Sequence, residues 1–140
     1  MGIPEMNAQP EFHVIKPVGD LNTAELQAVC HQRAYSAGWW DEYYAMPEAL
    51  RKHFIAGKIA LVHSEVSEAL EAFRKNKNDD HLPHRLGVEV EFADAMIRMY
   101  DLAGALGLDI GAAIAEKLAY NAQRPDHTRE ARAAEGGKSL

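Results

Sequence analysis

Apolar side chains recur at steps of three and four along most of this chain, which is the spacing of one face of an α-helix. A first helix is predicted to begin at Asn22–Thr23 and to end near Gly38, because Asn is a favoured cap and Gly a common stop. The pattern shows no strand-like alternation of useful length, so it favours an all-α fold. The apolar positions of this helix are Leu26, Val29, Cys30 and Ala34.

A longer helix is predicted from Pro47 to about Lys75, since proline suits the first turn of a helix. The next ten residues, 76–85, are polar and contain Pro83, so they are predicted to form a loop. The apolar stripe of this long helix consists of Ile55, Ile59, Val62, Val66, Ala69 and Phe73.

Two further helices complete the predicted core. The third runs from about Leu86 to Leu106 and is apolar around nearly the whole helical wheel, which predicts that it is buried. The fourth begins after Asp109, a good cap, and ends before Pro125. Four helices with short connections predict a four-helix bundle-like core.

The two ends of the chain differ from this helical part. Pro4, Pro10 and Pro17 are three of the six prolines, so residues 1–22 are predicted to form an extended N-terminal arm. A helical domain is then predicted at 23–125, followed by a loose, polar C-terminal tail at 126–140.

Composition and charge narrow the possible functions. The 140 residues suit one domain, and a net charge of −6 is a poor electrostatic basis for binding nucleic acid. An acidic protein that holds an anionic substrate needs a cation between the two. The single cysteine, Cys30, excludes an internal disulfide and a zinc site built on paired cysteines. No secretion signal or membrane span is expected, which favours a cytoplasmic location.

Two pairs of acidic residues are candidates for a metal site. Glu91 and Asp94 lie three residues apart on the apolar third helix, with Arg98 and Asp101 continuing their stripe, and a buried carboxylate needs a partner or a cation. On the second helix Glu65 and Glu68 have the same spacing. That pair alone is typical of an ordinary solvated surface.

Converging carboxylates suit a hard divalent cation. Mg²⁺ is usually held by a few carboxylates, water molecules and substrate phosphates, so this set favours a magnesium–phosphate site over zinc. Lys58 precedes Glu65 by two turns and shares its face. No Glu-x-x-His pair is present, which argues against a di-iron carboxylate bundle. The residues themselves therefore predict a divalent-cation site between two helices.

The order of these motifs resembles the all-α nucleoside triphosphate pyrophosphatase superfamily, and specifically its MazG-like branch. The similarity covers most of the chain and includes both acidic motifs, the aromatic exit of the first helix and a closing Lys–Asn–Arg segment. The four matching segments are His31–Glu42, Lys58–Lys75, Val90–Ile110 and Lys117–Pro125.

The resemblance implies an activity: hydrolysis of a nucleoside triphosphate between its α- and β-phosphates, giving the monophosphate and pyrophosphate. It implies two or more Mg²⁺ ions, for which Mn²⁺ can substitute. The implied catalytic and metal-binding residues are Glu65, Glu68, Glu91 and Asp94. The implied contacts to the substrate's phosphates or sugar come from Lys58, Lys117, Asn121 and Arg124.

The chain departs from the family pattern at two places. Ser64 stands where many members have a glutamate, and the residues after Pro125, DHTREARAAEGGKSL, differ from the basic, His- and Gly-containing ending that family members often have. Two alternatives stay open: a relative with a narrower substrate (dGTP, dUTP or phosphoribosyl-ATP), and a non-catalytic helical oligomerisation module.

An aromatic stretch after the first helix offers a place for the nucleobase. Trp39 and Trp40 are candidates for stacking against it, the alternative being that they cap the bundle or fill a subunit interface. Tyr43 and Tyr44 suit that structural role better. A four-helix unit with one helix this apolar is expected to bury surface against another copy, which predicts a homodimer or a homotetramer.

Overall fold

The computed structural model describes residues 16–134 and residue 136. Residues 1–15 of the predicted N-terminal arm lie outside the described residues. Within them the chain is helical, and an isolated antiparallel bridge between Asn78 and Leu86 is the one β pairing in this part. The α-helices are α1 (Thr23–Ser36), α2 (Asp41–Ala45), α3 (Glu48–Lys75), α4 (Gly87–Ala105), α5 (Ile110–Ala122) and α6 (Arg129–Ala133), with short 3-10 turns at Val18–Asp20 and Pro125–His127.

The predicted helix ends are confirmed at the positions where a cap was recognisable. The side chain of Asn22 accepts a hydrogen bond from the backbone N–H of Glu25, and the Asn22 N–H donates to the side chain of Glu25. Asp109 caps α5 through the N–H of Ala112. Asn76 ends α3 in the left-handed conformation, at φ 48°.

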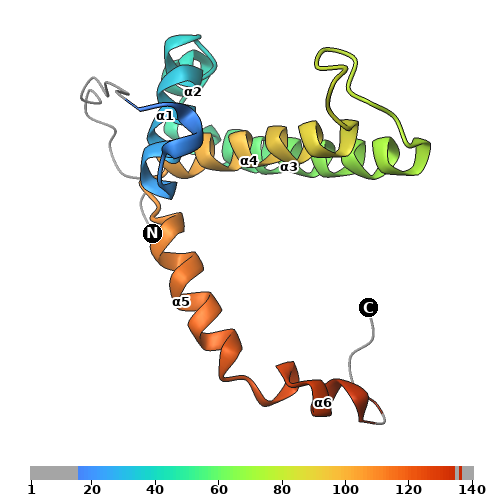
Figure 1. The fold of residues 1–140 in the computed structure, drawn as a ribbon. Helices are drawn as coiled ribbons and strands as arrows, with labels where there is room; N and C mark the ends of the chain where they lie inside the picture. The colour runs from blue at the N-terminus through green and yellow to red at the C-terminus, as the bar shows by residue number, and fades with distance from the viewer. Residues whose placement is uncertain (1–15, 135, 137–140) are drawn as a thin grey trace. The chain divides into compact units, whose positions relative to one another are not determined.

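The chain divides into two compact units, the first ending at Leu108 and the second beginning at Asp109. In the first unit α3 and α4 run side by side, and α1 and α2 lie at the end of this pair where α3 begins (Figure 1). Helix α1 packs against the C-terminal half of α4. There a Cβ on Gly104 would lie 2.6 Å from the Cβ of His31, so only glycine allows this approach.

The connection between α3 and α4 is closed at its base. The N–H of Gly87 donates to the carbonyl of Lys77 at 2.8 Å, and that of Asp79 donates to the carbonyl of Arg85 at 3.0 Å. A Cβ on Gly87 would meet the Lys77 carbonyl oxygen at 2.9 Å and the Cβ of Ala72 at 3.0 Å. The loop predicted at 76–85 is therefore a folded excursion that returns the chain directly to the start of α4.

The core of the first unit gathers where α1, α2, α3 and α4 meet. Trp40 is completely buried there and packs with Tyr43 and Phe54 at ring-centroid distances of 5.4 and 5.8 Å. Leu102 and Ala105 supply the contribution of α4 to the same cluster. Two residues of the aromatic stretch that follows α1, Trp40 and Tyr43, thus belong to the core, and its short helix α2 was not predicted.

One prediction about the elements is wrong. Helix α4 is not buried on all sides, since four of its apolar side chains are about half exposed. The described residues after α5 form the turn Pro125–His127 and helix α6. The half-exposed residues of α4 are Phe92, Met96, Ile97 and Met99.

The described helices include none with the length and apolar character needed to cross a bilayer. The predicted fourth helix of the core corresponds to α5, which belongs to the second unit.

Candidate functional site

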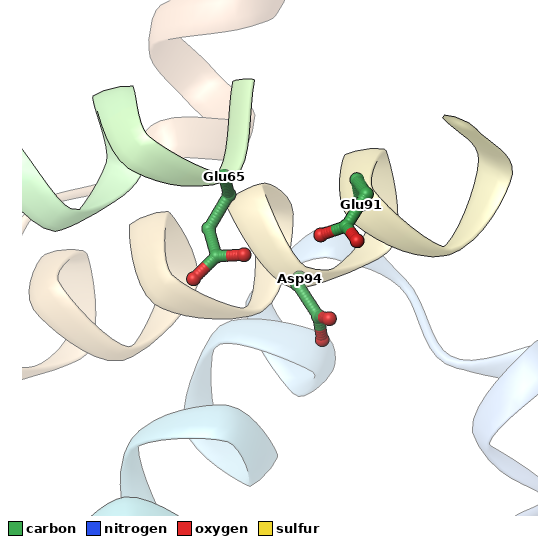
Figure 2. Close-up of side chains that lie close together, drawn as sticks. All are labelled: Glu65, Glu91 and Asp94. Carbon is green, nitrogen blue, oxygen red and sulfur yellow. The ribbon is translucent and has the colours of Figure 1, made fainter. Parts of the chain in front are cut away.

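Three carboxylates gather between the two long helices. Glu65 comes from α3, while Glu91 and Asp94 come from adjacent turns of α4 (Figure 2). One oxygen atom from each lies within 4.8 Å of the others, which is close enough for the three to share one cation. The i, i+3 spacing keeps the two acids of α4 on one face, and the side-by-side packing of α3 and α4 brings Glu65 to them.

Burial is distributed among these acids differently from the prediction. Glu65, which flanks the apolar stripe of α3 and was expected at the edge of the core, is the most buried of the three at 7% exposure. Asp94, expected inside a buried helix, is exposed, and Glu91 is intermediate. The reason is that Glu65 faces α4, whereas the side chain of Asp94 lines an open cavity between α1, α3 and α4.

The buried Glu65 has a partner that was not predicted. The Nε of Arg98 donates to Oε1 of Glu65 at 2.5 Å, and the Arg98 side chain is itself 42% exposed. Arg98 lies one turn beyond Asp94 on α4, so the sequence placed it on the correct face without showing its partner on α3. A cation of the protein thus compensates the charge of Glu65 at one edge of the cluster.

The acids of α4 repel their neighbours. Burial raises the pKa of Glu91 above its ordinary value of 4.5, and the charges of Glu68, Glu65 and Asp94 raise it further. Although Asp94 as a residue is exposed, partial burial of its carboxyl raises its pKa, with Glu65 adding to the shift and Arg98 opposing it. A divalent cation bound between these clustered carboxylates would stabilise their ionised forms.

Glu68, the fourth predicted ligand, is exposed on α3 and lies outside the group of three. Its charge is the first among the neighbouring charges that raise the pKa of Glu91, so it borders the cluster. Of the four predicted ligands, the structure brings three into common reach and places the fourth beside them.

A cavity of about 820 Å³ adjoins the carboxylates, between α1, α3 and α4. That volume is within the range of about 300–1,000 Å³ for small-molecule sites. The walls are mostly apolar, and Cys30, expected to be a small core residue, is half-buried among them. The charged and aromatic side chains that line the cavity are Arg33, Trp39, Lys58, Glu65, Asp94, Arg98, Tyr100 and Asp101.

The two tryptophans have separate roles. Trp39 is 69% exposed and lines the cavity, so its ring is open to stacking. Trp40 is fully buried, with Lys58 Nζ 4.9 Å from its ring centroid, so the expectation that it stacks on a base is corrected. The polar end of Trp40 explains its orientation, because Nε1 donates to Asp101 at 2.8 Å.

Asp101 anchors a buried polar network that was not predicted. Its Oδ1 accepts from Trp40 Nε1 and, at 2.9 Å, from His31 Nδ1, which joins α4 to α1 and to the start of α2. Asp101 also lines the cavity, and its side chain retains 12% exposure. The signal in the sequence was its position two turns after Asp94 on the same stripe of α4.

The remaining predicted substrate contacts, from Lys117, Asn121 and Arg124, belong to the second unit. Lys117 lies over the ring of Tyr120, with Nζ 4.8 Å from the centroid. Arg124 forms two hydrogen bonds to Asp126, at 2.9 and 2.5 Å, and this pairing raises the pKa of Arg124. Asn121 lies on α5 between these two cations.

Comparisons of the chain with protein-family models, with curated proteins and with solved structures found no match.

Proposed function

We propose that this chain is a Mg²⁺-dependent nucleoside triphosphate pyrophosphohydrolase of the MazG-like, all-α type. The observation that carries the proposal is the convergence of Glu65, Glu91 and Asp94 beside a cavity large enough for a nucleoside. The order of motifs in the sequence supplies the substrate class and the bond that is cut. The cluster and the cavity share Glu65 and Asp94, so phosphates held at the acids would bring the rest of a nucleotide to the cavity.

The proposed chemistry is hydrolysis at the α-phosphorus. Two or more Mg²⁺ ions, or Mn²⁺ in their place, would be held by Glu65, Glu91 and Asp94 with Glu68 beside them, and would activate water and neutralise the phosphates. The water oxygen forms a bond to the α-phosphorus, and the bond to the bridging oxygen breaks. Pyrophosphate leaves with that oxygen, and the water's proton passes to a carboxylate or to solvent.

The cations near the cluster suit phosphate contacts. Lys58 lines the cavity that Glu65 and Asp94 also line, so its ammonium group would stabilise the triphosphate. Lys117, Asn121 and Arg124 stay in the proposal as further contacts, because the closing segment of the sequence resembles that of the family.

The first experiment measures pyrophosphate release from the four common ribonucleotides and the four common deoxynucleotides, with Mg²⁺ and with EDTA. We expect release that requires the metal. Asp94→Asn should reduce kcat by about 100-fold or more. Glu89→Gln, an exposed change on the same helix, is the matched control, and circular dichroism should show unchanged helix content for both variants.

The outcome also separates the alternatives. Activity on one nucleotide alone would favour a narrow-specificity enzyme, such as one acting on dGTP or dUTP, and activity on phosphoribosyl-ATP alone would point to that relative. A clean protein without activity in Mg²⁺ or Mn²⁺ would leave the non-catalytic helical module. The half-exposed apolar side chains of α4 favour self-association of such a module. They equally favour a homodimer or homotetramer of the enzyme. We propose that the protein is cytoplasmic.

A further inference from the structure

Asp101 offers a polar group in a mostly apolar cavity. Its Oδ1 is used twice inside the protein, by His31 and Trp40. Among the described residues, both donors to this carboxylate use Oδ1, and the residue lines the cavity. The Asp101 side chain keeps 12% exposure, so its other oxygen, Oδ2, can accept from a ligand that brings an N–H or O–H donor, and a hydrogen bond to a charged group is a strong one.

The position of Asp101 fits the base of a nucleotide. It lies seven residues after Asp94, which is about 10 Å along the axis of α4. The cavity that both residues line has the volume of a small-molecule site, so it has room for a nucleoside. Trp39 lines the same cavity and is 69% exposed, so a flat ring entering there can stack on it.

We propose, resting on the function proposed above, that this cavity holds the nucleobase and that Asp101 Oδ2 selects bases carrying an exocyclic amino group. The amino group of adenine or cytosine would donate to this oxygen. A carbonyl at the same place, as in hypoxanthine or uracil, would face the carboxylate with its own lone pairs and be disfavoured. His31 and Trp40 fix the carboxylate through Oδ1, so Oδ2 is held in place before the base arrives.

Two pairs of nucleotides test the proposal on the unaltered protein. CTP differs from UTP, and ATP from ITP, in an amino group that replaces a carbonyl. We expect kcat/KM to favour the amino member of each pair by about tenfold or more, the value of one hydrogen bond to a charged group. Equal values, or a preference for UTP and ITP, would overturn the proposal. Release of pyrophosphate from none of the four would instead overturn the function on which it rests.

A single isosteric variant assigns the preference to Asp101. In Asp101→Asn the amide oxygen can still accept from His31 and Trp40, which turns the amide nitrogen, a donor, toward the cavity. We expect the preference within both pairs to shrink at least about tenfold or to reverse toward UTP and ITP. Glu89→Gln, the same chemical change on an exposed part of α4, should leave both ratios as they are.

A purely structural Asp101 would give a different result. In that case Asp101→Asn would change the melting temperature or lower kcat/KM for all four nucleotides alike, and the ratios within each pair would stay fixed. Fixed ratios in a folded, active variant would therefore contradict the proposal. Quenching of tryptophan fluorescence by cytidine and by uridine measures base binding without metal and without turnover. We expect the quenching seen in the wild type to be lost in Trp39→Leu.

Discussion

The ion pair between Arg98 and Glu65 puts a cation of the protein against one of the proposed metal ligands. A buried carboxylate is costly without a positive partner, so Arg98 stabilises the metal-free protein. The same guanidinium opposes the binding of Mg²⁺ through its charge and through its use of Oε1. Arg98 is 42% exposed, which leaves it free to move aside when a metal arrives.

Replacing Arg98 tests this competition. We expect Arg98→Met to bind Mg²⁺ about tenfold more tightly in calorimetry at neutral pH, and to gain more thermal stability from Mg²⁺ than the wild type. Arg85→Met, which removes an exposed cation paired with Glu89, is the control. Weaker Mg²⁺ binding by Arg98→Met would show instead that Arg98 holds Glu65 in position for the metal.

The raised pKa of Glu91 predicts a pH dependence of the metal-free protein. As pH rises past 4.5 the unfolded chain loses this proton first, so stability falls until the folded carboxyl also ionises. Glu91→Gln removes that loss, so its melting temperature should exceed the wild type's above this window, with no difference at lower pH. Thermal unfolding followed by circular dichroism from pH 3.5 to 8 measures it, with Glu89→Gln as the control. An equal difference at every pH would contradict the prediction.

At this scale the sequence predicted which acids could meet, because i, i+3 pairs on two neighbouring helices converge whenever the helices pack along their lengths. It did not predict which acid is buried. The rotation of α3 and α4 about their axes decides that, and the apolar pattern of α4 misled because it suggested cover on every side. The partners of Arg98 and Asp101 lie 33 and up to 70 residues away, beyond any local pattern.

At the scale of the elements, α4 is held at both ends by close approaches. Gly87 meets Ala72 and the Lys77 carbonyl at its start, and Gly104 meets His31 near its end. The site residues 91–101 lie between these two contacts. The position of α4 along α3 and α1 is therefore fixed by backbone approach as well as by side chains, which keeps Glu91 and Asp94 level with Glu65.

A methyl group at Gly104 should disturb this packing. Gly104→Ala places a Cβ 2.6 Å from that of His31, so α1 and α4 must separate, and we expect a loss of about 1–3 kcal/mol in the free energy of unfolding. Gly57→Ala, in the middle of α3 with open space around it, is the matched control and should gain about 0.5–1 kcal/mol. Urea denaturation measures the free energy of unfolding of both variants. An unchanged free energy of unfolding in Gly104→Ala would contradict the close contact with His31.

The long helices were predictable because their ends carry recognisable caps and their apolar positions are periodic. The short helices α2 and α6 were not, since five residues contain too little periodicity to distinguish a helix from a turn. The aromatic residues of α2 looked like a binding surface, yet Trp40 and Tyr43 are core. Aromatic composition alone does not separate these two uses.

At the scale of the whole molecule, α3 and α4 leave large apolar side chains in solvent. Phe73 is 70% exposed and Leu70 is 61% exposed, and Phe92 on α4 is 54% exposed. Large exposed apolar patches are typical of surfaces that bind another protein. A second copy of the chain could cover this surface, and the homodimer or homotetramer stays a prediction.

Sedimentation velocity tests the assembly. We expect the wild type to sediment as a dimer or tetramer, and Leu70→Lys combined with Phe73→Lys to weaken association at least about tenfold, because charged groups replace buried apolar ones. Leu82→Lys, on the loop between α3 and α4, should leave the assembly intact. A wild type that sediments as a monomer at micromolar concentration would refute the prediction.

The closed base of the connection between α3 and α4 has a practical consequence for engineering. The hydrogen bonds from Gly87 to Lys77 and from Asp79 to Arg85 hold the two ends of the loop together. A change in the length of the loop tip should therefore not change the distance between the two helices. A foreign peptide spliced in next to Pro83 would lengthen the excursion without shifting the carboxylates. The tip is therefore a natural graft point for a fluorophore or an affinity handle.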